Sequence, residues 1–377
     1  MRTSQLPYIV GVDIGGANLK LADTDGRGTS CSFPLWLQPE LLGDRLGELL
    51  REFPAPDELA ITMTGELADC FATRRDGVSR ILDQVGKAFS PEQTFVYAVG
   101  DRWLSPHEAR RDPWSVAASN WYALATWLGT CSLSPECGFS SPNPGRVNEP
   151  ALPLLLPRSA FLLLDIGSTT TDIIPVNFNQ AGKLAPATAA RTDRDRLERQ
   201  QLVYTGMQRT PVAAIVREVE LQGKRVPLMA ERFSTSDDSY LMLGLVLEDA
   251  ADCDTADGRP RTIAGAHARL ARMIGEDAET LSVAEAKQLA EQIIDAQAQQ
   301  IASALITNLN QFSATAARQN IIIGGHGRPL ALRAFAKLID GPVTIWLDEL
   351  LSTGLSRVAP AAAVAALRVA LTAHFIS

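Results

Sequence analysis

Two short segments of the chain contain the residue types that bind a phosphate together with a metal ion. They read DIGGANLK from Asp13 and DIGSTTTD from Asp165. Glycines and small residues in a tight turn leave backbone N–H groups open to an anion. An aspartate at the end of the preceding strand can bind Mg²⁺, which prefers one or two carboxylates together with phosphate oxygens. Each segment therefore predicts a phosphate site beside a magnesium ion.

The two segments also align with each other. Asp, Ile and Gly coincide, a small residue follows, and both copies continue into apolar sequence of the β type. Lys20 in the first copy takes the place of Asp172 in the second, so we expect it to neutralise phosphate charge from the opposite side. The predicted metal ligands are Asp13, Asp165 and Asp172, and the predicted phosphate-binding residues are Gly15, Gly16, Asn18, Gly167, Ser168, Thr169 and Thr170. Neither copy is a Walker A loop or a dinucleotide-binding fingerprint, because GKS, GKT and GxGxxG are absent from both.

Other residues extend this predicted site. The run Ile321–Gly325 predicts a buried strand that ends in a glycine turn at Gly324 and Gly325. Glu66 is the first choice for a general base and Asp69 the second, since their segment follows a predicted central strand. Glu66 could equally start a helix or form a salt bridge. Arg209 could hold a phosphate or a carboxylate through two hydrogen bonds, or lie on the surface.

Two polar segments have simpler interpretations. Thr235 and the residues up to Asp238 are expected to cap the helix that follows them. The stretch containing Asp252, Asp254 and Asp257 lacks the spacing of a calcium loop, so it predicts a turn with one functional carboxylate. The four histidines show no zinc-site spacing, which disfavours a zinc hydrolase.

The elements around these residues follow from hydrophobic spacing. Strands are expected at 8–14, 18–23, 59–64, 94–100, 161–166 and 321–325, and helices at 39–53, 114–128, 284–312 and 329–339 and over the last twenty residues. The repeated hairpin predicts an internal duplication of one α/β unit, which also accounts for 377 residues. We expect a two-lobed α/β protein, with lobes at 1–150 and 158–355, a Pro- and Gly-rich crossing at 131–157, and a C-terminal helix at 356–377.

Composition restricts the partners. Lys+Arg 35 against Asp+Glu 43 gives a net charge of −8, which does not favour nucleic acid or an anionic membrane. No apolar stretch is uninterrupted enough to span a bilayer. Five cysteines without CxxC spacing predict reduced thiols and a cytoplasmic location. Small molecules are therefore the expected partners, and the sequence leaves a homodimer open.

The paired hairpins followed by IIIGGHG resemble the actin, sugar kinase and Hsp70 superfamily over most of the chain. The resemblance implies two ribonuclease H-like lobes whose hairpins clamp phosphates, with the Gly-Gly turn of Gly324 and Gly325 against a nucleoside. It also implies that the C-terminal helix at 356–377 returns to the first lobe. Within this superfamily the chain is similar to the hydantoinase/oxoprolinase-like proteins of tetrahydromethanopterin-linked one-carbon metabolism. The segments that carry the similarity are TMTGELAD, ASNWYALATWLG, DIGSTTTDIIPV, YTGMQRTPVAAIV, DTADGRP and RLARMIGED.

Archaeal members of that group resemble a methanofuran-biosynthesis synthase. The resemblance implies a transferase that joins a furan methylamine diphosphate to the phenol of a glutamyl tyramine and releases pyrophosphate. Asp13, Asp165, Asp172 and Lys20 would then serve the diphosphate and Mg²⁺, and Glu66 or Asp69 would take the phenol proton. One alternative is an ATP-dependent kinase or a hydantoinase-like hydrolase, because the same hairpins would hold ATP. Another is a noncatalytic nucleotide-binding sensor or partner protein.

Overall fold

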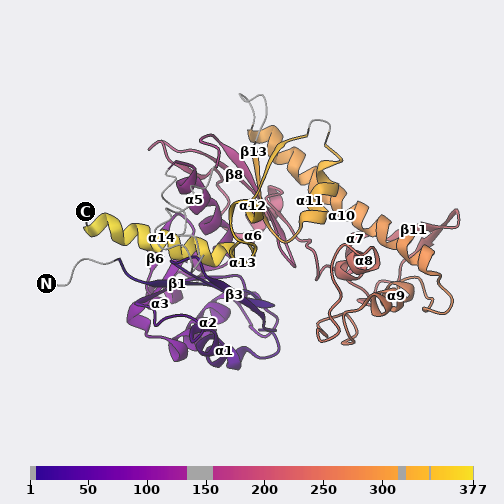
Figure 1. Ribbon diagram of the computed structural model, residues 1–377, viewed down its shortest axis with the longest axis horizontal. Helices are drawn as coiled ribbons and strands as arrows, with labels where there is room; N and C mark the ends of the chain where they lie inside the picture. Colours follow the sequence, from indigo (N-terminus) through magenta and orange to yellow (C-terminus); the bar gives the residue numbers. More distant parts are fainter. Residues whose placement is uncertain (1–5, 134–155, 313–319, 339–340, 377) are drawn as a thin grey trace, which may run out of the picture.

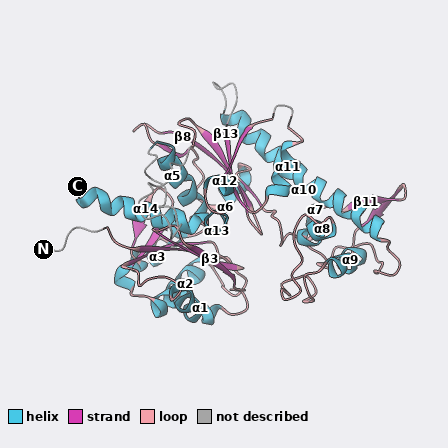
Figure 2. Ribbon diagram, in the orientation of Figure 1, coloured by secondary structure: helices cyan, strands magenta, loops and turns pink. Residues whose placement is uncertain are grey.

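Two β-sheets form the frame of the protein (Figures 1 and 2). The computed structural model describes residues 6–133, 156–312, 320–338 and 341–376. The first sheet has the order β3-β2-β1-β4-β5-β6, with β1 Ile9–Ile14, β2 Asn18–Asp23, β3 Gly28–Ser32, β4 Glu58–Met63, β5 Thr94–Ala98 and β6 Arg102–Leu104. The second has the order β10-β8-β7-β13-β14, with β9 also paired to β8. Its strands are β7 Phe161–Ile166, β8 Thr171–Phe178, β9 Leu184–Pro186, β10 Leu202–Val203, β13 Asn320–Gly325 and β14 Val343–Trp346.

The two sheets repeat one pattern. In each, the first strand pairs antiparallel with the second through a short hairpin and parallel with a later strand on its other side. Asp13 lies opposite Lys20 in the first hairpin, and Asp165 lies opposite Asp172 in the second. The alignment made from the sequence, with Lys20 in the place of Asp172, is therefore confirmed by the strand register.

Period-two alternation decides which face each strand side chain covers. In β7, Leu162 and Leu164 pack against α10 (Val283–Phe312) and α11 (Arg328–Phe335), while Phe161 and Leu163 face the core between the sheets. In the first sheet the outer face is covered by α1 (Leu42–Leu50) and α2 (Arg74–Ala88). Both sheets are thus buried on two faces, which is why their central strands are almost continuously apolar.

The core between the sheets contains one helix from each half of the chain. Helix α14 (Ala359–Ile376) packs on β1, β2 and β4 of the first sheet, and α5 (Asn120–Leu133) packs on α14 and on β8 and β9 of the second. Two glycines allow these close approaches. A Cβ at Gly11 of β1 would lie 2.0 Å from the carbonyl oxygen of Ala361, and one at Gly129 of α5 would lie 2.3 Å from that of Leu184. Helix α14 of the second half thus covers the first sheet, and helix α5 of the first half covers the second sheet.

A smaller core extends from the second sheet. It joins α7 (Val212–Ile215), β11 (Glu218–Leu221), β12 (Lys224–Pro227), α8 (Ser236–Met242) and α9 (Ile263–Arg272) to the first half of α10. Figure 1 shows these elements grouped at the right, away from the first sheet. We call residues 212–293 the outer subdomain. The sequence did not predict it, because its strands are short and its helices lack a repeated motif.

Most of the expected elements are present. The 30-residue helix α10 and strand β13 agree closely with the prediction. The helix expected at 114–128 is wrong: α4 (Pro113–Val116) ends before Ala118, whose φ of 48° breaks the helix, and α5 begins at Asn120. The remaining short helices are α3 Pro106–Arg111, α6 Asp193–Glu198, α12 Leu347–Leu350 and α13 Thr353–Arg357, with 3-10 turns at Pro39–Leu41 and Pro91–Gln93.

Two expectations concern the limits of the described structure. Most of the crossing segment expected at 131–157, with the end of the first predicted lobe at residue 150, lies outside the described residues, so the division into lobes stays a prediction. In the parts of the chain that are described, no helix combines the length and the apolar character needed to cross a membrane.

Candidate functional site

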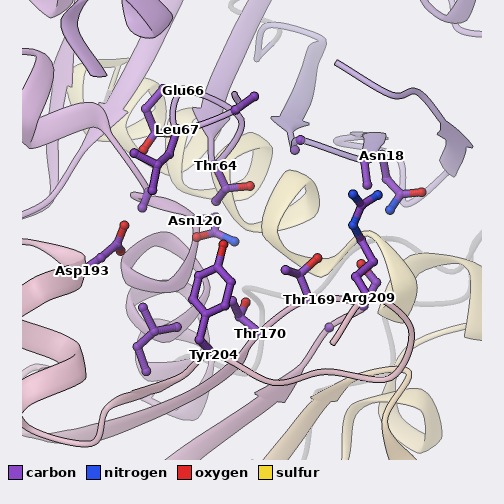
Figure 3. Close-up of a pocket in the computed structure, with 18 of the residues that line it drawn as sticks. Asn18, Thr64, Glu66, Leu67, Asn120, Thr169, Thr170, Asp193, Tyr204 and Arg209 are labelled. Carbon is purple, nitrogen blue, oxygen red and sulfur yellow. The ribbon is translucent and has the colours of Figure 1, made fainter. Parts of the chain in front are cut away.

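The tips of the two hairpins face one cavity of about 370 Å³ between the sheets (Figure 3). Its walls include almost every residue predicted for the site: Asp13, Gly15, Gly16, Asn18, Lys20, Glu66, Asp69, Asp165, Gly167, Ser168, Thr169, Thr170, Asp172 and Arg209. Gly324 and Gly325 instead line a neighbouring cavity. Residues that are far apart in the sequence thus meet at one place, although the role of each stays a prediction.

The same hydrogen bond closes both hairpin turns. The Gly15 N–H donates to the carbonyl of Asn18 at 3.0 Å, and the Gly167 N–H donates to that of Thr170 at 2.9 Å. Within the described parts of the chain, the N–H groups of Gly16 and Ser168 have no backbone acceptor. A side chain at Gly16 would meet nothing within 4 Å, so the turn is open toward the cavity. Both turns can therefore present N–H groups to an anion.

A segment of the second half supports the second hairpin from behind. The N–H of Met207 donates to the Gly167 carbonyl at 3.0 Å, and those of Gln208 and Arg209 donate to the Ser168 carbonyl at 2.9 and 3.0 Å. This contact requires Gly206, because a Cβ there would lie 2.6 Å from the Gly167 oxygen. The YTGMQR segment thus positions the hairpin and also brings Arg209 to the cavity.

Of the predicted metal ligands, Asp13 and Asp172 are buried and Asp165 is half-buried. Asp13 is 2% exposed; Lys20 Nζ lies 3.5 Å from its Oδ2, and its Oδ1 has no hydrogen-bond partner among the described residues. Burial raises the pKa of Asp13, and it raises that of Asp165 to about 7 with a contribution from the Asp172 carboxylate. Asp172 is ion-paired with Arg196 of α6, yet burial still raises its pKa. Lys20 and Arg196 supply positive charge to Asp13 and Asp172, whereas Asp165 forms no ion pair among the described residues.

A divalent cation beside a diphosphate fits these residues. The unpartnered Asp13 oxygen and the raised pKa of Asp165 both indicate carboxylates that a cation would stabilise. No group of three or more His, Cys, Asp or Glu side chains in the described part of the chain is arranged to hold a metal ion by itself. Mg²⁺ takes one or two carboxylates and fills its other positions with phosphate and water.

Glu66 lies at the opposite end of the cavity from Arg209 (Figure 3). The residue is 1% exposed, and its Oε2 has no hydrogen-bond partner in the described structure. Burial raises the pKa of Glu66 to about 7 and outweighs Arg74, whose Nη1 is 3.9 Å from Oε1. The Ala118 N–H acts in the opposite direction, toward a lower pKa. A carboxylate with a pKa near neutrality can accept a proton under ordinary conditions.

Two arginines form ion pairs at the Glu66 end of the cavity, and one of these pairs joins the two halves of the chain. Arg74 of α2 forms a short ion pair with Asp193 of α6, and Arg196 contacts both Asp172 and Asp193. Asp193 and Arg196 line the cavity but were not predicted. Their segment, RTDRDRLERQ, has the pattern of an exposed charged helix, so only the tertiary fold places them at the site.

Aromatic residues also line the cavity. Tyr204 lies between Asp193 and Arg209 in Figure 3, and the Arg209 guanidinium stacks on Trp36 at 4.1 Å from the ring centroid. Burial raises the pKa of Tyr204, so its hydroxyl stays protonated. Tyr204 occurs in the same quoted segment as Arg209, which could have identified it. Trp36 had no signal, because it follows β3 in an irregular stretch.

The glycine turn lines a neighbouring cavity of about 140 Å³ with His326, Arg328 and Trp346. A Cβ at Gly324 would lie 2.9 Å from Asp165 Oδ1, so this turn touches the second hairpin strand. Arg328 stacks on the Trp346 indole at 4.3 Å and pairs with Glu349. The neighbouring cavity therefore has one aromatic wall that is already covered by a side chain.

The two simpler interpretations of polar segments can be compared with the structure. The Thr235 N–H donates to the Asp238 carboxylate at 3.2 Å at the start of α8, so the capping interpretation is confirmed. Asp257 binds Arg269 and Arg272 within the outer subdomain, while Asp252 and Asp254 line a cavity beside the main one.

Comparison with known proteins identifies the family. Residues 140–368 match the hydantoinase/oxoprolinase family. The (4-{4-[2-(gamma-L-glutamylamino)ethyl]phenoxymethyl}furan-2-yl)methanamine synthase of Methanocaldococcus jannaschii is 34% identical over 275 residues, which cover 72% of each chain. The chain belongs to the hydantoinase/oxoprolinase family. A synthase of the same name from Methanococcus vannielii is 28% identical to this chain over 177 residues, which cover 47% of this chain and 75% of the relative.

A solved structure places this hydantoinase/oxoprolinase protein in a fold. The nucleotide-free structure of an acetone carboxylase matches 96% of this chain and 70% of its own with a TM-score of 0.53 at 10% identity. At that identity the likeness shows the fold alone. Together with the repeated sheet pattern, it confirms the expected two-lobed fold of duplicated ribonuclease H-like units.

Proposed function

We propose that the protein is a transferase of methanofuran-type cofactor biosynthesis. It joins a furan methylamine diphosphate to the phenol of γ-glutamyltyramine and releases pyrophosphate. The enzyme name that the two relatives share describes the ether that this reaction forms. The observation that carries the proposal is the single cavity that contains two anion-binding hairpins at one side and a buried Glu66 with a pKa of about 7 at the other.

The reaction needs a nucleophile, a leaving group and a base. The phenol oxygen forms a bond to the CH₂ carbon attached to the furan, while the bond from that carbon to the diphosphate oxygen breaks. The electron pair of the broken bond leaves with pyrophosphate, and the phenol proton passes to Glu66. Holding the two substrates in one cavity supplies the orientation that the displacement requires.

The hairpins would hold the diphosphate. The N–H groups of Gly16 and Ser168 and the ammonium of Lys20 supply positive ends to its oxygens, where negative charge grows as the bond breaks. Asp13 and Asp165 would hold Mg²⁺, which when bound supplies further positive charge to the leaving diphosphate. Asp172 is the third predicted ligand, and its ion pair with Arg196 competes for the same carboxylate.

The second candidate is an ATP-dependent kinase or hydrolase. The cavity beside Gly324 and Gly325 supports it, since a nucleoside would lie there in this fold. Against it, Arg328 already stacks on Trp346 and so covers the indole face that a base could stack on in this cavity. We therefore favour diphosphate over ATP. The odd set of cysteines without CxxC spacing supports a cytoplasmic location.

The decisive experiment measures pyrophosphate release by purified protein with Mg²⁺, the furan methylamine diphosphate and γ-glutamyltyramine. Release that requires both substrates, is lost on chelation and falls at least about 100-fold in Asp13→Asn supports the proposal. Hydrolysis of ATP with no pyrophosphate release from the furan substrate would instead favour the kinase or hydrolase.

A further inference from the structure

A further small cavity, distinct from the one beside Gly324 and Gly325, opens beside the main cavity. It measures about 100 Å³ and shares Asn18, Arg209 and Arg232 with the main cavity. Its other walls include Ser32 and Gln208 and, from the outer subdomain, Asp252, Asp254 and Arg261. We call it the side pocket. A ligand in the main cavity can therefore extend one end into the side pocket without leaving the protein.

The side pocket carries both signs of charge. Arg209 and Arg232 lie near enough that Arg232 helps to lower the pKa of Arg209, although burial is the larger cause. Asp252 and Asp254 face them from the turn before α9. A half-buried guanidinium beside a second one is stabilised by an added carboxylate, and carboxylates are in turn stabilised by an added ammonium.

Two of the arginines of the side pocket are held in place, and a third is free. Arg209 stacks on Trp36 and lies 3.5 Å from Asp254. Arg261 donates two hydrogen bonds to Asp237 and one to the Leu247 carbonyl, so it is occupied as part of the wall. Arg232 is exposed and forms no ion pair among the described residues. One preorganised guanidinium and one free guanidinium are thus available for a single carboxylate.

We propose that the side pocket binds the free amino acid end of the γ-glutamyl group. This inference rests on the proposed function. A γ-linked glutamyl group keeps its α-carboxylate and its α-ammonium, and these two charges match the two arginines and the two aspartates of the side pocket. Arg209 and Arg232 bind the carboxylate, Asp254 with Asp252 binds the ammonium, and Trp36 orients Arg209. The phenol at the other end of the acceptor remains in the main cavity.

Acceptor analogues that each lack one charge test the proposal. 4-Aminobutanoyl-tyramine lacks the α-carboxylate, and glutaryl-tyramine lacks the α-ammonium. We compare kcat/KM for these two and for γ-glutamyltyramine in the wild type, Arg232→Gln and Asp254→Asn. Arg225→Gln is the matched control. Arg225 is an exposed arginine of the same subdomain, and its ion pair in the described structure is with Glu218 on the neighbouring strand.

Each variant should lose one preference and keep the other. In the wild type, removal of either charge should lower kcat/KM at least about tenfold, as expected for a lost charged contact. Arg232→Gln should shrink the preference over the aminobutanoyl analogue by about tenfold and leave the preference over the glutaryl analogue, and Asp254→Asn should do the reverse. Equal use of all three acceptors by the wild type, or an equal loss for all three in both variants, would overturn the proposal.

A binding measurement separates this inference from the proposed reaction. If the wild type releases no pyrophosphate with any acceptor, the proposed function is wrong, and calorimetry with γ-glutamyltyramine alone decides the side pocket. Binding that weakens about tenfold in Arg232→Gln but not in Arg225→Gln supports the side pocket. Binding that is absent, or equal in all proteins, overturns it.

Discussion

Glu66 combines burial with an unpartnered oxygen at the edge of the cavity, and this sets its chemistry. Its pKa of about 7 means that the carboxylate is available above neutrality and is protonated below it. Asp69, the second choice for the base, is exposed and lines the same cavity. The contrast between the two side chains favours Glu66 as the group that takes the phenol proton.

The pH profile of the reaction tests that assignment. We expect kcat/KM of the wild type to rise with pH, to bend near pH 7 and to level off above it, because only ionised Glu66 accepts a proton. Glu66→Gln should lower kcat by about 10²–10⁴-fold and remove the bend near pH 7. If Asp69→Asn removes the bend and Glu66→Gln does not, the base is Asp69.

The same carboxylate should reduce stability when it is ionised. Folding raises the pKa of Glu66 from 4.5 to about 7, so the folded state binds more protons than the unfolded state between these values. The contribution of Glu66 to the free energy of unfolding therefore falls as pH rises from about 4.5 to about 7 and is constant above, with a total of roughly 3 kcal/mol.

Denaturant unfolding of wild type and Glu66→Gln at pH 5 and pH 8 measures this effect. The free energy of unfolding of the wild type should decrease relative to that of the variant between the two pH values. A difference between the two proteins that does not change with pH would contradict the assigned pKa.

At the scale of elements, the second hairpin depends on the segment behind it. Gly206 brings that backbone so close that a Cβ would collide with the Gly167 oxygen and the Ser168 carbon. Gly206→Ala should shift the turn and raise the KM for the furan diphosphate about tenfold or more, since a displacement of about 1 Å in a binding group is costly. Gly341→Ala is the control, because a Cβ there meets nothing within 4 Å. Equal KM values in the two variants would show that the turn does not need this support.

Local sequence explains why the hairpins could be predicted and much of the cavity could not. Asp13 and Gly15 belong to one strand and its turn, so their spacing alone places them together. Tyr204, Asp193 and Trp36 reach the cavity from loops and a short helix whose positions depend on distant contacts. Ala118 could not be predicted either, because its positive φ is imposed by the packing around α5 and not by its residue type.

At the scale of the whole molecule, the two sheets are joined through α5 and α14. The family resemblance implied that the C-terminal helix returns toward the first half, but no local pattern indicated that α5 packs on the second sheet. Such packing is decided by long-range contacts, of which Gly11 and Gly129 are the points of closest approach. The arrangement makes both halves part of one cooperative core.

Gly11→Ala tests this arrangement. The added Cβ would lie 2.0 Å from the Ala361 oxygen, so α14 must move away from β1, and we expect the free energy of unfolding to fall by about 1–3 kcal/mol. Gly47→Ala on α1 is the control, since a Cβ there meets nothing and should stabilise the helix slightly. Equal losses of stability in the two variants, measured by denaturant unfolding, would contradict the close packing.

The exchange of last helices has a consequence for the origin of the architecture. A protein made of only one such unit would leave an apolar sheet face bare, and it could cover that face by trading its terminal helix with an identical neighbour. The present chain has the geometry of two swapped copies joined end to end. In such a dimer, the ligand site between the two sheets would lie at the boundary between the subunits.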